Sequence, residues 1–290
     1  MKIAVTGLTG FIGSHLKIFL MEMGHQVIGI SRKDFSEEGM GGLTDKLTGC
    51  NAVINLAGAP INGRWNRRRK EAILTSRVET TRKLTEAINR LPHLPELFIS
   101  TSAIGYYPST GVSDEKTEPA RESFLSHVCQ EWEAEARKVN PAVRLVILRF
   151  GLILGAQGGV LPKIMAPSKR GVSVIFGTGH QPFSWIHIDD LMEVFKLMLY
   201  DKQLSGVFNC VAPDTLTWLD LMSELDMHFE PFWRVHVPEW LLRLFLLDGA
   251  SLLTEGQQVV PQRLQERNFT YQYPELKDAI TDLVEKFNGK

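Results

Sequence analysis

The first residues of the chain join a short apolar strand to a glycine-spaced turn and then to a helix. Residues 3–6 read Ile-Ala-Val-Thr. They are followed by Gly7, Gly10 and Gly13, which are spaced three residues apart. We expect Gly7 to permit the tight bend, Gly10 to leave room for a pyrophosphate, and Gly13 to let the helix pack closely on the strand. The helix start would add free N–H groups and a positive dipole. This segment therefore predicts a dinucleotide site.

Short apolar segments alternate with segments of helical periodicity over the first two-thirds of the sequence. The predicted strands span residues 2–6, 26–31, 52–56, 96–102 and 143–150, and the predicted helices span residues 11–23, 65–89 and 123–139. Strand and helix repeated in this order indicate an α/β protein with a parallel sheet and helices on both faces. Together with the glycine turn, the pattern predicts a doubly wound Rossmann sheet.

The second predicted strand ends in Ser31 and Arg32. A site for NAD usually carries a carboxylate here for the ribose 2′-hydroxyl group, whereas the 2′-phosphate of NADP requires a donor such as arginine. Arg32, with Ser31 as a second donor, therefore favours NADP(H). The alternative is that Arg32 is only a solvated cation at the end of a strand.

A segment rich in glycine, proline and lysine, residues 155–179, interrupts the alternating pattern. Beyond it we expect a strand at 206–211 and helices at 240–253 and 275–287. We predict an NADP-binding Rossmann domain over residues 1–155, to which 180–212 return. Residues 156–179 and 213–290 would form a smaller, mostly helical C-terminal domain for the substrate.

Composition excludes several classes of protein. The net charge of −1 argues against nucleic acid as a partner, because phosphate binding needs a basic surplus. The three cysteines include no CxxC pair, and the eight histidines show no metal-binding spacing, so we expect neither disulfides nor a metal. No signal peptide and no long apolar run are apparent, which favours a cytoplasmic protein without membrane contact.

Further motifs narrow the assignment. They are Asn55-Leu56-Ala57-Gly58, Ser76-Arg77, Ser102 with Gly105-Tyr106-Tyr107, Cys129 with Trp132-Glu133, the segment 184–190, Val260-Pro261-Gln262-Arg263-Leu264 and Tyr273-Pro274-Glu275-Leu276. Over nearly the whole chain the sequence resembles the extended, atypical short-chain dehydrogenase/reductase superfamily. Within it, the sequence is similar to the epimerase family of nucleoside-diphosphate-sugar epimerase-like proteins that carry a small C-terminal domain of unknown function.

The resemblance implies where the cofactor lies. Leu56, Ala57 and Gly58 would line it, and Arg77 would reach it from the following helix, unless Arg77 is an ordinary surface charge. The complete predicted set of cofactor-binding residues is Gly7, Thr9, Gly10, Phe11, Ile12, Gly13, Ser31, Arg32, Leu56, Ala57, Gly58 and Arg77.

Short-chain dehydrogenases usually transfer hydride with a Tyr-xxx-Lys pair, in which lysine lowers the tyrosine pKa. Here Cys129 and Glu133 stand at those positions, so the usual pair is absent. A Tyr-xxx-Lys spacing at Tyr273 lies in the C-terminal segment and is attributed to coincidence. The remaining catalytic candidates are Ser102, Tyr106 and Cys129, although Ser102 could be a turn hydroxyl group and Cys129 a buried thiol.

These features predict an NADP(H)-dependent oxidoreductase or epimerase that acts on a small, nucleotide-sugar-like substrate between the two domains. The alternative is a binding protein that senses NADP(H) without efficient catalysis, as the missing pair would allow. A homodimer is a further expectation. His187 could belong to the substrate pocket or make a structural hydrogen bond.

Overall fold

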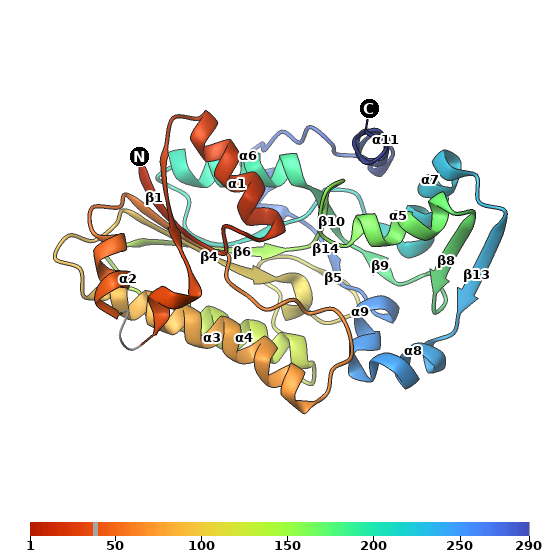
Figure 1. Cartoon of the computed structure of the whole chain (residues 1–290), viewed down its shortest axis with the longest axis horizontal. Coiled ribbons are helices and arrows are strands. Elements are labelled where there is room, and N and C mark those ends of the chain that lie inside the picture. The colour runs from red at the N-terminus through yellow and green to blue at the C-terminus, as the bar shows by residue number, and fades with distance from the viewer. Residues whose placement is uncertain (37–39, 290) are drawn as a thin grey trace.

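The protein is described by a computed structural model that covers residues 1–36 and 40–289. In this part of the chain, six strands form one sheet in which every neighbouring pair is parallel (Figure 1). Their order across the sheet is β2 (Gln26–Ile30), β1 (Lys2–Thr6), β3 (Ala52–Asn55), β4 (Leu97–Ala103), β6 (Arg144–Phe150) and β11 (Gly206–Cys210). The predicted α/β fold with a doubly wound parallel sheet is confirmed.

The strand order reverses direction at β1. The chain leaves β1 for β2 on one side and returns to β3 on the other, so that Thr6 lies beside both Ile30 and Asn55. The connections after β1 and β3 therefore run to opposite faces and leave a crevice at the carboxyl ends of these strands. Crevices of this kind are where doubly wound proteins bind ligands.

Helices cover both faces of the sheet (Figure 1). One face carries α1 (Phe11–Glu22) and α6 (Ile188–Tyr200), and the other carries α2 (Met40–Leu47), α3 (Arg67–Asn89) and α4 (Phe124–Ala136). Each face of the sheet has its own hydrophobic core, and alternate residues of β1 point into one or the other. Ile3 and Val5 are buried with α1 and α6, whereas Ala4 is buried with residues of α3. The three helices predicted over residues 11–139 are present as α1, α3 and α4, and α2 is an addition among them.

The C-terminal part is smaller and largely helical, as predicted. It includes α5 (Leu161–Lys169), α7 (Trp218–Phe229), α8 (Glu239–Leu246), α9 (Ser251–Thr254), α10 (Gln262–Glu266) and α11 (Leu276–Phe287), together with the parallel pair β8 (Val172–Phe176) and β13 (Trp233–Val237). A separate core lies among α5, α7 and α11. The exact division into domains stays a prediction.

Three short strand pairs connect distant segments. They are β7 (Leu152–Leu154) with β10 (Trp185–His187), β9 (Pro182–Phe183) with β12 (Leu216–Thr217), and β5 (Val112–Ser113) with β14 (Gln258–Val259). The last pair attaches the C-terminal segment to the loop that follows β4. Among the described residues, no helix has the length and apolar character needed to cross a bilayer.

One predicted helix is interrupted. The sequence suggested a continuous helix over 240–253, but α8 ends at Leu246, and Leu247 has a positive φ of 54°. The cause is packing against the loop before α3, because the carbonyl group of Leu246 accepts a hydrogen bond from the backbone of Trp65. A Cβ atom at Gly249 would lie only 2.4 Å from the carbonyl oxygen of Gly63.

Candidate active site

The glycine turn after β1 has the geometry that its spacing predicted. Gly7 has a φ of 70°, and a Cβ atom at Gly13 would lie 2.2 Å from the carbonyl oxygen of Gly7. At Gly10, an added Cβ would meet only this same oxygen, at 3.2 Å, so the space beyond Gly10 is open. The backbone conformation at Gly7 and the close packing at Gly13 therefore require glycine for folding. At Gly10 the absence of a side chain leaves open space beside the turn.

Helix α1 begins without a side-chain cap. Gly10 is its N-cap residue and the first turn contains no acidic residue, whereas Asn66 caps α3 and Ser123 caps α4 through their side chains. The N–H groups of an uncapped first turn are available to an anion. Of the other predicted residues here, Thr9 is exposed, and the ring of Phe11 fills the space that a side chain at Gly155 or Gly158 would need.

Two buried threonines hold the ends of β1 and β3 together. The hydroxyl group of Thr6 donates to Oδ1 of Asn55 at 2.8 Å and accepts from the backbone N–H groups of Leu56 and Ala57. Nδ2 of Asn55 donates to the hydroxyl group of Thr81 at 2.7 Å. This network fixes Leu56 and Ala57 beside the glycine turn. Thr6 could have been singled out as a polar residue at the end of an apolar strand, whereas Thr81 lies in a polar helix and has no such signal.

The short helix that follows β2, Arg32–Phe35, carries a carboxylate that is already paired. Oδ2 of Asp34 accepts hydrogen bonds from the backbone and the hydroxyl group of Ser31 and forms an ion pair with Lys46 at 2.8 Å. Burial alone would raise the pKa of Asp34, but the bonds from Lys46 and Ser31 outweigh it and lower the pKa. The hydroxyl proton of Ser31 is thus directed to Asp34. Arg32 is exposed and has no ion pair within the described part of the chain.

A pocket of about 360 Å³ opens at the carboxyl edge of the sheet. The Rossmann side contributes Ile12, Leu56, Ala57, Gly58, Arg77, Ser102 and Cys129, and the opposite side contributes Pro182, Phe183, Ser184, Leu253 and Gln257. A second cavity of about 480 Å³ shares Ser123, Leu125, Ser251, Glu255 and Gln257 with it, so the two adjoin. The pocket thus joins predicted cofactor residues to two of the three catalytic candidates. Tyr106 does not line it.

Arg77 is a half-buried cation at the wall of this pocket. Its Nη1 donates to the carbonyl oxygens of Ala59 and Ile73, both at 3.1 Å, and its guanidinium group lies against Gly58 and over the ring of Trp132. Burial lowers the pKa of Arg77. No carboxylate in the described chain forms an ion pair with it. A bound anion could therefore provide the missing countercharge.

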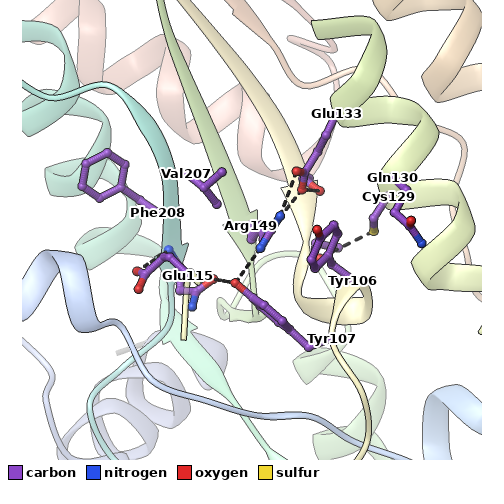
Figure 2. Close-up of polar contacts among 12 residues, drawn as sticks. Tyr106, Tyr107, Glu115, Cys129, Gln130, Glu133, Arg149, Val207 and Phe208 are labelled. Carbon is purple, nitrogen blue, oxygen red and sulfur yellow. Dashed lines mark hydrogen bonds and ion pairs between the residues drawn. The ribbon is translucent and has the colours of Figure 1, made fainter. Parts of the chain in front are cut away.

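Ser102 is connected to a buried ion pair between Glu133 and Arg149, and Figure 2 shows this ion pair. The hydroxyl group of Ser102 donates to Oε1 of Glu133 at 2.8 Å, and Arg149 donates to both carboxylate oxygens of Glu133, at 2.7 and 2.9 Å. Arg137 adds a fourth donor at 2.8 Å. Burial would raise the pKa of Glu133, but the bonds and charge of Arg149, with those from Ser102 and Arg137, lower it. Glu133 is therefore an ionised acceptor.

The network continues from Arg149 toward the C-terminal segment. Figure 2 shows that Nη1 of Arg149 donates to the hydroxyl oxygen of Tyr107, at 2.8 Å. Tyr107 in turn donates to Oδ1 of Asn209 at 2.8 Å. Burial raises the pKa of Tyr107 to about 12. The ring of Tyr106 faces the guanidinium group of Arg149, whose Cζ lies 3.4 Å from the ring centre. Tyr106 and Tyr107 thus hold Arg149 in place, and the catalytic role of Tyr106 stays a prediction.

Cys129 lies in the pocket wall next to Ser102. Its thiol group donates a weak hydrogen bond to the carbonyl oxygen of Ala103 at 3.6 Å, and only 3% of the side chain is exposed. Burial and the negative charge of Glu133 raise the pKa of Cys129 to about 11. The thiol is therefore protonated near neutral pH.

His187 lies away from both cavities. It is fully buried and is the N-cap of α6, where its Nδ1 accepts from the backbone of Asp189 at 3.1 Å, and its Nε2 lies 3.1 Å from Asp282. The side chain of His187 caps α6, and Asp189 and Asp190 lie in its first turn. Lys286 forms ion pairs with Asp189 and Asp282, so its ammonium group already balances the charge of the carboxylates beside His187. The ring of Tyr273 stacks on His187, with centroids 4.0 Å apart.

Comparisons with known proteins agree with this geometry. The model of the NAD dependent epimerase/dehydratase family matches residues 3–210, and a domain of unknown function, DUF1731, matches residues 237–283. An Arabidopsis thaliana protein, "Epimerase family protein SDR39U1 homolog, chloroplastic", is 35% identical and covers 98% of this chain and 87% of its own. The Bacillus subtilis epimerase family protein YfhF is 32% identical over 98% of each chain.

Solved structures of epimerase family proteins and of more distant proteins share the fold of this chain. The crystal structure of the human epimerase family protein SDR39U1 with NADPH has a TM-score of 0.91 and 33% identity, and covers 98% of this chain and 99% of its own. MoeE5 in complex with UDP-glucose and NAD has a TM-score of 0.81 at 20% identity, with 100% and 99% coverage, which shows a shared fold. The chain therefore belongs to the NAD dependent epimerase/dehydratase family.

Proposed function

We propose that this protein binds NADP(H) at the turn after β1 and uses it in an oxidoreductase or epimerase reaction on a small polar substrate. The observation that carries the proposal is the pocket that joins Leu56, Ala57 and Gly58 to Ser102 at the carboxyl edge of the sheet. The substrate class implied by the family is a nucleotide sugar, which would lie between the sheet edge and the C-terminal segment.

The residues present suit the cofactor. The open space at Gly10 and the uncapped start of α1 favour a pyrophosphate, and the exposed guanidinium group of Arg32 favours the 2′-phosphate of NADP(H). The carboxylate of Asp34, which could otherwise select NAD, is held by Lys46. Arg77 would offer its charge from the pocket wall. When bound, NADP(H) supplies or accepts a hydride.

Ser102 and Glu133 would accept the proton that leaves a substrate hydroxyl group. Because the Ser102 proton is directed to an ionised carboxylate, Ser102 presents only lone pairs to the pocket, where it would accept a hydrogen bond from a substrate hydroxyl group. If that hydroxyl proton moves to Oγ of Ser102, the original Ser102 proton can move to Oε1 of Glu133. Ser102 would touch the substrate, whereas Glu133 would act through Ser102.

A second candidate function is a sensor of NADP(H). It is favoured by the departure at Cys129 and Glu133, since a thiol with a raised pKa and a carboxylate held by Arg149 cannot repeat the chemistry of a tyrosine and a lysine.

A metabolite screen by thermal shift tests the proposal. In the presence of NADPH or NADP+, a substrate should raise the melting temperature further by mass action, and its turnover should change NADPH absorbance. Failure of NADPH itself to stabilise the protein would refute the cofactor assignment. Stabilisation by NADPH without turnover of any carbonyl compound or nucleotide sugar would favour the sensor.

A further inference from the structure

A row of large apolar side chains lies exposed along β13 and α8. Phe232 is 89% exposed and Trp233 72%, and on α8 the exposed fractions are 68% for Trp240, 63% for Leu244 and 65% for Phe245. These five residues are called the β13–α8 face below. Figure 1 shows β13 at the outer edge of the molecule, with α8 at its far end. Exposed apolar surface on this scale marks an interaction site.

The strand itself is also unfinished. β13 pairs with β8 on one side only, and no described strand pairs with its other edge. An open edge presents unpaired N–H and C=O groups that can bond to another strand. Any occupant of this face must therefore cover apolar rings and satisfy a strand edge together.

We propose that the occupant is a second copy of this chain. In an antiparallel pairing of two β13 strands about a two-fold axis at Val235, Trp233 of one copy lies opposite Val237 of the other. Val237 leads through Pro238 into α8. Each α8 therefore covers the Phe232–Trp233 end of the other copy, and the same patch serves both sides, as a two-fold interface requires.

The available area is sufficient for a stable pair. A buried aromatic side chain contributes about 150–250 Å², so the exposed parts of these five residues offer about 600–700 Å² on each copy. Two copies would bury about 1,300 Å², within the range of about 1,200–2,000 Å² for specific interfaces. The neighbouring cations are already paired, Arg234 with Asp226 and Arg243 with Glu239. A lipid surface would find no free positive charge in these two residues and could not satisfy the strand edge.

Sedimentation velocity on the full chain tests the proposal. We expect a dimer at micromolar concentration. Trp233→Glu and Phe245→Glu should each raise the dimer dissociation constant more than tenfold, while the circular dichroism spectrum stays unchanged. A monomeric wild type, or variants that remain fully dimeric, would overturn the proposal. A monomer that sediments with vesicles of phosphatidylglycerol and phosphatidylcholine would show that the face binds membranes instead.

A cross-link tests the pairing itself. Facing positions in an antiparallel pair are about 4.5–5.5 Å apart, which suits a disulfide. Cys50, Cys129 and Cys210 are buried, so Val235→Cys should form a covalent dimer on mild oxidation. Met227→Cys, at a position that is 62% exposed on α7, is the matched control and should remain monomeric in denaturing electrophoresis. Equal cross-linking of both variants, or none by Val235→Cys, would reject the antiparallel contact.

Discussion

The hydroxyl group of Ser102 donates a 2.8 Å hydrogen bond to Glu133, the residue expected from the sequence at the position of the usual lysine. Glu133 in turn binds Arg149 through both carboxylate oxygens. The positive charge beside Ser102 therefore comes from Arg149 on β6, on the far side of the Glu133 carboxylate from Ser102. Because the Ser102 proton is directed to Glu133, Ser102 is a hydrogen-bond acceptor toward the pocket, and its stability and its chemistry can be tested separately.

Glu133→Gln should destabilise the fold by about 3–5 kcal/mol, because it leaves the buried guanidinium group of Arg149 without its countercharge. Ser102→Ala should cost only about 1 kcal/mol, since Glu133 keeps three other donors. Urea unfolding measures both values. Equal costs for the two variants would contradict the role given to the ion pair.

The pH dependence of the unfolding free energy should also show the contribution of the ion pair between Glu133 and Arg149. The folded-state pKa of Glu133 is lowered, so its ionised form contributes stability that is complete above its unfolded pKa of about 4.3 and is lost as the pH falls through the lowered value. The wild type should therefore lose more stability than Glu133→Gln between neutral and acidic pH. Parallel curves of unfolding free energy against pH would argue against this.

Cys129 should resist alkylation in the folded protein. Its pKa of about 11 leaves very little thiolate at pH values near 8, and the side chain is buried. Iodoacetamide treatment followed by peptide mass spectrometry should show modification of Cys129 only after unfolding in urea. Rapid labelling of the native protein would mean that the thiol is activated, and would support a catalytic role for Cys129.

Arg32→Ala should weaken NADPH binding by about 10–100-fold, as expected for the loss of a charge-assisted hydrogen bond. NADH has no 2′-phosphate, so its affinity should not change. Calorimetric titration of both cofactors gives the comparison, and Lys33→Ala is a matched control on the same short helix, Arg32–Phe35. If wild type binds the two cofactors equally, Arg32 does not read the phosphate.

Gly10→Val and Gly13→Val should fail in different ways. At Gly10 the added side chain enters open space, so the fold should survive while NADPH binding is lost. At Gly13 it meets the backbone of Gly7 and Leu8 at 2.2 and 2.7 Å, so the fold itself should be damaged. Thermal unfolding and cofactor titration separate the two effects. A folded Gly10→Val variant that still binds NADPH would refute the phosphate-binding role of the turn.

Tyr273→Phe should leave turnover nearly unchanged, because Tyr273 stacks on His187 and lines neither cavity. Ser102→Ala, in the pocket wall, should reduce turnover by about 100-fold. Both variants should bind NADPH normally. Rates would be measured on the substrate found in the screen, and a large loss for Tyr273→Phe would place the catalytic pair in the C-terminal segment.

The fold of the first two-thirds was predictable because its signals are local. The glycine turn and the apolar strands depend on neighbours in sequence, and each predicted strand lies within a residue or two of its position. Helix α7 was missed although its signal is present: Trp218, Leu221 and Leu225 share one face, and Thr217 with Asp220 forms a capping box. The break at Leu247 depends on Trp65, far away in the chain, and has no local signal.

The site was only partly predictable for the same reason. Ser102 and Cys129 could be placed in the pocket by resemblance, but the partner of Glu133 could not, since Arg149 lies on another element. A signal existed, because Arg149 is the only charged residue among residues 145–150. A charge within an apolar strand requires a buried partner. The pairing of Asp34 with Lys46, which directs the Ser31 proton, was equally invisible in the sequence.

The attachment of the C-terminal segment limits how this enzyme-like pocket can admit a ligand. Beyond the pairing of β14 with β5, Ser184 bonds to the backbone of Gln257 and Val259, and Asp190 accepts from the backbone of Gln272 and Tyr273. These bonds connect the C-terminal segment to the part of the chain that carries the parallel sheet. A wide hinge opening of the pocket would therefore have to break all of them at once. Selection among ligands should therefore operate by size at the entrance, and bulky analogues should be excluded sterically rather than accommodated.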